Sequence, residues 1–304
     1  MKFVAWVCTC FVAVCATSPS VLHNQSAVLQ PIAQGTNLDC EPYAQTDEVL
    51  AFAETHTIVL GEMHGTNESV EALTGLVCAA LMKGTPVTIG LEAAAWQGEP
   101  LNQLLQLPFD EAAVLKAAPE MWQVEDGRSS AAIMSLLKLL SYRRSAGDDV
   151  SVFAFDYSFS EWNREEPLHI ARDQIMATRV DEVVSDRKGA VFILTGEFHA
   201  RKTPFEFGSE RYVPMAALVT SRPVLSLKMV YDAGEAWVQA GIEKSDGTYE
   251  DFVGPLKLQS IAAAGSPVRS FIWAKDPEGH FDGSYFTGPV TASAPAIRAR
   301  NADQ

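Results

Sequence analysis

Basic side chains are scarce in this sequence. Its 304 residues contain 23 Lys and Arg against 38 Asp and Glu, which gives a formal net charge of -15. Proteins that bind nucleic acid or anionic membranes gather Lys and Arg into dense patches that neutralise phosphates. No stretch of this chain reaches that density, and even YRRS at residues 142–145 is short. We therefore expect no nucleic-acid partner.

Several well-known catalytic and cofactor motifs are also missing. The sequence has no Gly-x-Ser-x-Gly nucleophile elbow, no Gly-rich phosphate loop and no Cys-x-x-Cys-His attachment motif for haem. Any chemistry must therefore come from other residues. The five cysteines are few, and three of them lie in the first 16 residues. Cys40 and Cys78 remain, either as a disulfide in an oxidising compartment or with Cys78 as a simple core residue.

The first residues have the order of a secretory signal peptide. Lys2 precedes an apolar segment and then small residues, so we expect residues 1–16 to be removed and the protein to be exported to the periplasm or secreted. A lipoprotein with Cys15 as the lipid-bearing residue is less favoured, because Val14 stands where a small residue is expected. We expect no membrane span in the remainder.

The remaining chain divides by composition and periodicity. Residues 17–46 read as an N-terminal arm, residues 47–288 as one domain, and residues 289–304 as a disordered tail. Within the domain, apolar runs alternate with amphipathic segments, which predicts an α/β fold with a layered, mostly parallel sheet and helices on both faces. Two later segments, at 235–242 and 268–274, are expected to form antiparallel edge strands.

Two short stretches repeat the same arrangement of acid and histidine. TIVLGEMHG ends an apolar run on Glu62 and His64, and AVFILTGEFH ends another on Glu197 and His199. The repetition predicts two related halves. In an extended strand, residues i and i+2 project to the same face, so each Glu and His should point together. Because ligands bind beyond the carboxyl ends of parallel strands, we expect His64 and His199 to meet at one crevice.

Two more acids end predicted strands and extend the candidate site. Glu92 closes VTIGLE, and Asp156 closes VSVFAFD. His64, His199 and Glu92 could bind a divalent metal such as Zn, Mn or Co. Alternatively, the Glu and His side chains could activate a water molecule as general bases without metal. The other four histidines are expected to be solvated and uninvolved: His23, His56, His169 and His280.

The motifs LGEMHGTNE, GLE, FAFD, ARDQIMA and LTGEFHA, in that order, resemble the superfamily of ChaN-like, Tiki/TraB-type and erythromycin esterase proteins. The resemblance spans residues 56–231 and implies a duplicated α/β fold with its centre at Glu62, His64, Glu92 and His199. Glu197 matches less strictly. Arg172 of the ARD motif is similar to a recurring arginine of the ChaN-like branch, although an exposed helix charge is an equal alternative.

The branches of this superfamily differ in activity. In the first motif a single residue separates the Glu from the His, where erythromycin esterases typically have two, and this favours the ChaN-like or Tiki-like branches. ChaN-like proteins are associated with haem in iron uptake, for which Tyr142, Tyr157 and the histidines are candidate ligands here. Tiki-like proteins are metal-dependent peptidases.

The sequence therefore predicts an exported hydrolase that acts on an ester or amide bond in a small molecule or peptide. The predicted catalytic residues are Glu62, His64, Glu92, Glu197 and His199. Asp156 and Arg172 are predicted to support them. The alternative is a haem- or metal-binding protein of iron uptake without catalysis. A partner-binding protein that retains the fold without chemistry is a third reading.

Overall fold

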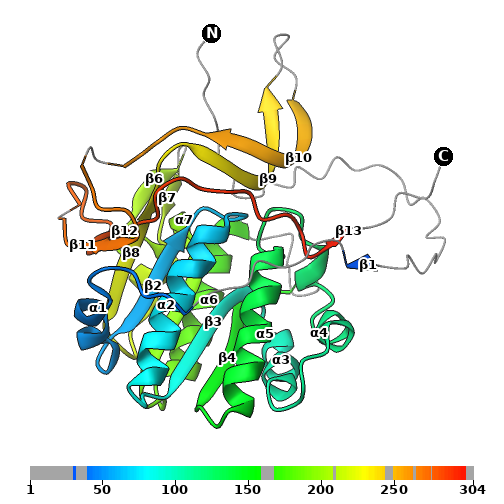
Figure 1. The fold of residues 1–304 in the computed structure, drawn as a ribbon. Helices are drawn as coiled ribbons and strands as arrows, with labels where there is room; N and C mark the ends of the chain where they lie inside the picture. The colour runs from blue at the N-terminus through cyan, green and yellow to red at the C-terminus, as the bar shows by residue number, and fades with distance from the viewer. Residues whose placement is uncertain are drawn as a thin grey trace, which may run out of the picture.

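A seven-stranded, mostly parallel sheet forms the centre of the computed structural model (Figure 1), which describes residues 30–31, 40–158, 168–207, 210–243, 249–262, 265–274 and 276–298. Only the edge strand β11 runs antiparallel to its neighbour. In spatial order the strands are β11 (Ser270–Ile272), β12 (Gly283–Phe286), β8 (Val224–Val230), β2 (Thr57–Glu62), β5 (Ala190–Gly196), β3 (Val87–Ala94) and β4 (Val150–Asp156). The predicted fold class is confirmed.

The central strands are buried on both faces. Every residue of β2, β3 and β5 is buried, which explains why their sequences are nearly continuous apolar runs without polar alternation. β2 and β5 are direct neighbours, and Glu62 is paired in register with Gly196. The two Glu-x-His stretches therefore leave the sheet side by side.

Helices cover both faces of the sheet and divide the core into two clusters. Ile58 and Leu60 of β2 pack toward one cluster, whereas Val59 between them packs toward the other, as the pleat of a strand requires. The first face carries α1 (Thr46–Ala53), α2 (Asn67–Met82), α3 (Gly98–Leu104), α4 (Glu111–Ala117) and α5 (Ala131–Ser145), and the second carries α6 (Leu168–Val184), α7 (Glu197–Ala200) and α8 (Met215–Leu218). Two short 3-10 helices are η1 (Ala95–Gln97) and η2 (Met121–Gln123).

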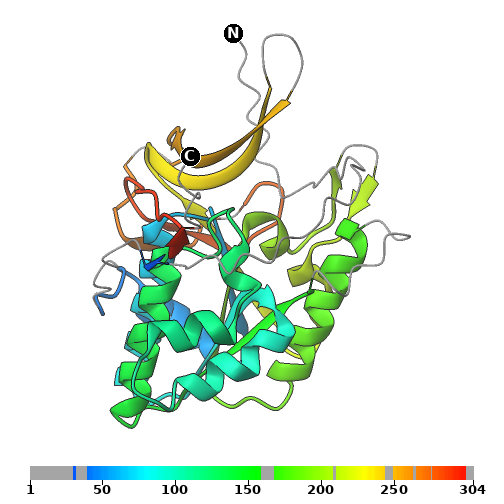
Figure 2. The same cartoon turned by 90° about the vertical axis from the view of Figure 1, so that its right-hand side faces the viewer.

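Antiparallel strands occur at one edge and above the sheet. β11 lies in the predicted 268–274 segment and is an edge strand, as expected. The 235–242 segment instead belongs to β9 (Gly234–Glu243), which pairs with β10 (Tyr249–Leu258) in a separate ribbon that rises above the carboxyl edge of the sheet (Figure 2). A small hairpin joins β6 (Phe205–Phe207) to β7 (Glu210–Tyr212). No helix in the described ranges is long and apolar enough to cross a bilayer.

Both ends of the domain are more ordered than their composition indicates. The last part of the predicted arm is packed: Tyr43 is only 2% exposed, and Cys40 is bridged to Cys78. The prediction of a disordered tail is wrong for residues 289–298, where Val290 and Ile297 are buried and β13 (Ile297–Arg298) pairs with β1 (Gln30–Pro31). The predicted signal peptide and residues 299–304 lie outside the described residues.

The Cys40–Cys78 bridge joins the start of the domain to the middle of α2. Next to it, Gly75 allows the incoming chain to cross α2 closely, because a Cβ there would lie 3.0 Å from the carbonyl oxygen of Glu41. Of the two alternatives predicted for Cys78, the structure shows the disulfide.

We expect Cys40→Ser to lower the free energy of unfolding by about 2–4 kcal/mol, because the bridge closes a long loop in the unfolded chain. The sequence separation is 38 residues. Urea denaturation with and without a reductant measures the effect. The reductant should destabilise the wild type and leave Cys40→Ser unchanged, and equal sensitivity of both proteins would contradict the bridge.

Candidate functional site

A buried carboxylate lies at the centre of the candidate site. Glu92 is 7% exposed and sits where the pairing of β3 with β4 shifts register, between Leu91 and Ala94. Such a bulge turns a side chain away from its regular direction, and bulges are frequent beside active sites. The two oxygens of Glu92 accept four hydrogen bonds: Oε2 from Thr195 Oγ1 (2.6 Å) and the Gly196 amide (2.8 Å), and Oε1 from Arg172 Nη2 (2.6 Å) and Arg128 Nη1 (3.2 Å).

These contacts keep Glu92 ionised. Burial alone would raise the pKa of Glu92, but the positive charges of the surrounding histidines and arginines outweigh burial and hold the pKa well below its ordinary value. Glu92 is therefore a fixed anion and not a proton acceptor at neutral pH.

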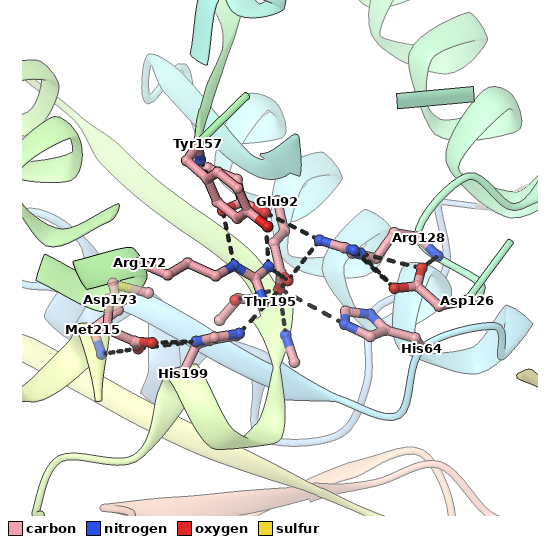
Figure 3. Close-up of polar contacts among 12 residues, drawn as sticks. His64, Glu92, Asp126, Arg128, Tyr157, Arg172, Asp173, Thr195, His199 and Met215 are labelled. Carbon is pink, nitrogen blue, oxygen red and sulfur yellow. Dashed lines mark hydrogen bonds and ion pairs between the residues drawn. The ribbon is translucent and has the colours of Figure 1, made fainter. Parts of the chain in front are cut away.

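His64 approaches Glu92 from the loop after β2. Its Nδ1 lies 2.9 Å from Oε1 of Glu62, whose other oxygen accepts a hydrogen bond of 2.6 Å from Ser69 Oγ on α2. Its Nε2 lies 3.7 Å from Oε2 of Glu92 (Figure 3). The first Glu-x-His pair thus points to one side, as predicted. The side chain of His64 is 21% exposed, so it is reachable from solvent.

The charge around His64 favours its protonated form. Burial would lower the pKa of His64, but the carboxylates of Glu92 and Glu62, with a smaller effect of Asp126, raise it to about 9. At neutral pH the imidazolium therefore predominates in the absence of a ligand.

His199 approaches Glu92 from α7, on the other side (Figure 3). Its Nδ1 lies 2.9 Å from Oδ1 of Asp173, which is itself held by the Met215 amide at 2.6 Å and by the Tyr212 hydroxyl. Its Nε2 is buried, lies 3.8 Å from Oε1 of Glu92 and has no hydrogen-bond partner among the described residues. The two histidines therefore face the two oxygens of one carboxylate, and the prediction that they meet at one site is confirmed.

Glu197 does not join this centre. Because it begins the helical turn of α7, residues 197 and 199 project in nearly opposite directions, about 200° apart at 3.6 residues per turn. Glu197 instead forms ion pairs with Arg201 and Lys228, each at 3.2 Å. The structure therefore contradicts the predicted catalytic place of Glu197, and the acid that orients His199 is Asp173.

Two arginines connect Glu92 to further acids. Arg172 donates from Nε to Asp156 Oδ1 at 3.0 Å and from Nη2 to Oδ2 at 2.7 Å, so the predicted Asp156 and Arg172 both lie in the site. Arg128 also reaches Asp156 at 3.0 Å and is held by Asp126. Burial would lower the pKa of each guanidinium, but the facing carboxylates raise it, so both arginines stay charged.

The sequence patterns missed Arg128, Asp126 and Asp173. Asp173 directly follows Arg172 in the ARD motif, so the signal was present but was assigned to the arginine alone. Arg128 and Asp126 lie in a polar loop without periodicity. That loop reaches the site because Gly127, at φ 97°, packs against the loop of Gly65, where a Cβ on Gly127 would lie 2.4 Å from the Gly65 nitrogen.

The remaining histidines and tyrosines have other surroundings. Tyr157 lies beside the centre, with the Arg172 guanidinium 5.7 Å from its ring, whereas Tyr142 is 70% exposed near the end of α5. His56 precedes β2, at the opposite end of that strand from Glu62. His280 pairs with Glu278 at 2.9 Å and is only 8% exposed, so the expectation that it is solvated is wrong. His23 and the side chain of His169 lie outside the described residues.

The donor set does not fit a divalent metal at Glu92. Both oxygens of this carboxylate already accept hydrogen bonds. Two of these four bonds come from guanidinium groups, whose positive charge would repel a cation. Within the described part of the chain, no group of three or more His, Cys, Asp and Glu side chains has an arrangement that could hold a metal ion.

Comparison with known proteins identifies the fold. No family model and no curated protein sequence matches the chain. Among solved structures, a mutant of the erythromycin esterase EreC in its open conformation is similar at a TM-score of 0.58 and 13% identity, covering 84% of this chain and 99% of that one. A succinoglycan biosynthesis protein has a TM-score of 0.57 at 9% identity, covering 88% of this chain and 95% of that one.

A third similar structure is a protein from Bacillus cereus, with a TM-score of 0.53 and 11% identity, covering 88% of this chain and 96% of the other. At such low identities the likeness concerns the fold alone. The chain has the α/β fold of the erythromycin esterase EreC, as the motif resemblance predicted.

Proposed function

We propose that this chain is a hydrolase that cleaves an ester or amide bond in a small molecule or peptide by proton transfer between water, substrate and two histidines. The observation that carries the proposal is the convergence of His64 and His199: each has a carboxylate at Nδ1, and each directs Nε2 at Glu92. A carboxylate only accepts hydrogen bonds, so it fixes the proton on Nδ1 and leaves Nε2 to face the reaction.

His199 is the proposed general base. With Nδ1–H donated to Asp173, the lone pair of the neutral ring is on Nε2, which is buried and without a hydrogen-bond partner in the described residues. A water molecule at this nitrogen could lose a proton to it while attacking the substrate carbonyl. Glu92 then stabilises the imidazolium that forms, because its carboxylate stays ionised beside it.

His64 is the proposed general acid. Its raised pKa keeps it protonated at neutral pH, and its partial exposure lets it reach a leaving group. Donation of the Nε2 proton to the leaving oxygen or nitrogen completes the cleavage. Arg128 and Arg172 hold Glu92 in place between the two histidines.

The fold and the disulfide support this proposal in different ways. One protein of the same fold is an erythromycin esterase, which cleaves an ester, as its name says. The Cys40–Cys78 bridge supports export, because disulfides persist in oxidising compartments, in agreement with the leader pattern of residues 1–16. No observation favours haem or metal transport over hydrolysis, so that alternative stays a prediction of the motif resemblance.

The first test is substitution of the two histidines, singly and together. With p-nitrophenyl butyrate as the ester probe, we expect His64→Asn and His199→Asn each to lower kcat/KM by about 10²- to 10⁴-fold, since each removes one proton-transfer group. The kcat/KM of the double variant should be no more than about threefold below that of the less active single variant, because the two groups act in one reaction.

His56→Asn is the matched control. Because His56 lies at the far end of β2 from Glu62, this substitution should leave the rate unchanged. Two independent effects that multiply in the double variant would contradict a shared reaction. Retention of wild-type activity in either single variant would contradict the role of that histidine.

The second test is the pH dependence of the rate. If His64 must be protonated, kcat/KM should fall as pH rises through about 9, the pKa to which the neighbouring carboxylates raise this group. Glu62→Gln removes the hydrogen-bonding carboxylate and should move this alkaline limb to lower pH. Glu54→Gln, which changes an exposed acid after α1, is the control and should not move it.

Stability should follow the same protonation. A histidine whose pKa is raised on folding stabilises the native state fully below its ordinary value of 6.5, and this contribution is lost as pH rises through about 9. Urea denaturation over this pH interval should therefore show a decline in the free energy of unfolding that is absent in His64→Asn.

In the kinetic experiment, an alkaline limb of kcat/KM near pH 6.5 in the wild type would rule out His64 as the general acid. An unshifted alkaline limb in Glu62→Gln would rule it out as well.

A further inference from the structure

Two catalytic groups lie on loops outside the sheet, which raises the question of what holds them in place. His64 lies in the loop between β2 and α2, and Arg128 lies in the loop before α5. Neither loop takes part in the pairing of the seven-stranded sheet. Positioning within a fraction of an ångström decides the rate of proton transfer, so loops of this kind need a rigid support.

The C-terminal segment Val290–Ile297, here called the strap, crosses over the carboxyl edge of the sheet (red in Figure 1). Its sequence, VTASAPAI, consists of small and apolar residues without charge. Val290, Ser293 and Ala296 are at most 5% exposed, so the strap is packed into the domain.

On one side the strap holds the loop of His64 and the first turn of α2. The Ser293 amide donates to the Gly65 carbonyl at 2.7 Å, directly after His64. Thr291 donates from its amide (2.9 Å) and its hydroxyl (2.6 Å) to the two oxygens of Glu68, and its hydroxyl also accepts from Asn67 at 2.9 Å. The residue after Glu68 is Ser69, whose hydroxyl holds Glu62.

On the other side the strap holds the loop of Arg128 and the start of α5. The Ala296 amide donates to the Ser129 carbonyl at 2.8 Å, and the Ala131 amide donates to the Ala294 carbonyl at 2.8 Å. The hydroxyl of Ser293 accepts from the Ala132 amide at 3.1 Å. The strap therefore joins the beginnings of two helices whose preceding loops carry His64 and Arg128.

We propose that the strap is a positioning element of the site, and that Thr291 and Ser293 are positioning residues that act through these two loops on His64 and Arg128. The proposal rests on the hydrolase function proposed above. In the part of the chain that the structure describes, no hydrogen bond joins Thr291 or Ser293 to Glu92 or to either histidine of the site. Their effect on the reaction is indirect, through the distances from His64 and Arg128 to Glu92.

The test compares variants that each delete one hydroxyl of the strap. Thr291→Val removes the hydroxyl bonds to Glu68 and Asn67 and keeps the amide bond to Glu68. Ser293→Ala removes the acceptor of the Ala132 amide. With p-nitrophenyl butyrate we expect each variant to lower kcat about five- to tenfold with KM within about twofold, because catalytic alignment changes and substrate contacts do not. Thr291→Ser keeps the hydroxyl and should restore kcat.

Thr287→Val is the matched control. Thr287 is a buried threonine just before the strap, and its hydroxyl bonds to the carbonyls of Val230 and Gly288 and not to either loop. Thr291 is exposed whereas Thr287 is buried, so thermal unfolding of every variant is measured beside kcat to compare them at known stability. If Thr287→Val lowers kcat as much as Thr291→Val at equal stability, the strap has no special role and the proposal is overturned.

Hydrogen exchange measured by mass spectrometry separates this proposal from the proposed function. Thr291→Val should speed exchange in peptides covering residues 63–69, and Ser293→Ala in peptides covering 128–133, whereas Thr287→Val should change neither. Faster exchange with unchanged kcat would overturn the positioning role and leave the hydrolase proposal intact. If the wild type hydrolyses nothing, the hydrolase proposal fails. If hydrogen exchange is unchanged in the variants, the strap does not support the two loops, whatever the activity of the wild type.

Discussion

The site depends on one buried anion at the carboxyl end of β3. Removing a carboxylate from water costs several kcal/mol, about as much as a few hydrogen bonds to charged groups return. Glu92 receives four hydrogen bonds from three elements: the end of β5, helix α6 and the loop before α5. The anion therefore holds these elements together, and each of them also contributes or adjoins a residue of the proposed chemistry.

The sequence predicted the parts of this arrangement that depend on strands. Glu62, Glu92 and Asp156 each end an apolar run, and parallel strands bring such ends to one edge of a sheet. His64 and His199 follow neighbouring strands, so their meeting could also be predicted. These positions could be predicted because an apolar run shows where a strand ends, and the alternation of a strand determines the face to which each side chain points.

The rest could not be predicted from the same patterns. The repetition of Glu-x-His suggested that Glu197 copies Glu62, but the chain turns into a helix at Glu197 and its side chain leaves the site. Arg128 reaches Glu92 from 36 residues away through a loop, a contact that tertiary packing alone determines. The end of the chain, which includes most of the strap, is small and polar, and this composition predicts disorder. The backbone of the strap is nevertheless paired with two helix starts, and pairing of this kind has no sequence signature.

The proposed mechanism also has an electrostatic consequence. During hydrolysis His199 gains a proton as His64 loses one, and their Nε2 atoms lie 3.8 Å and 3.7 Å from the oxygens of Glu92. The total charge around the buried carboxylate is then the same before and after the transfer, although the proton has moved from one side to the other. A buried network of this kind needs little reorganisation when the sum of its charges is constant, because its hydrogen bonds already point at the charges they must stabilise. The four hydrogen bonds that keep Glu92 in place thus serve both states of the reaction, which explains how a carboxylate too strongly bound to exchange protons can still contribute to proton transfer.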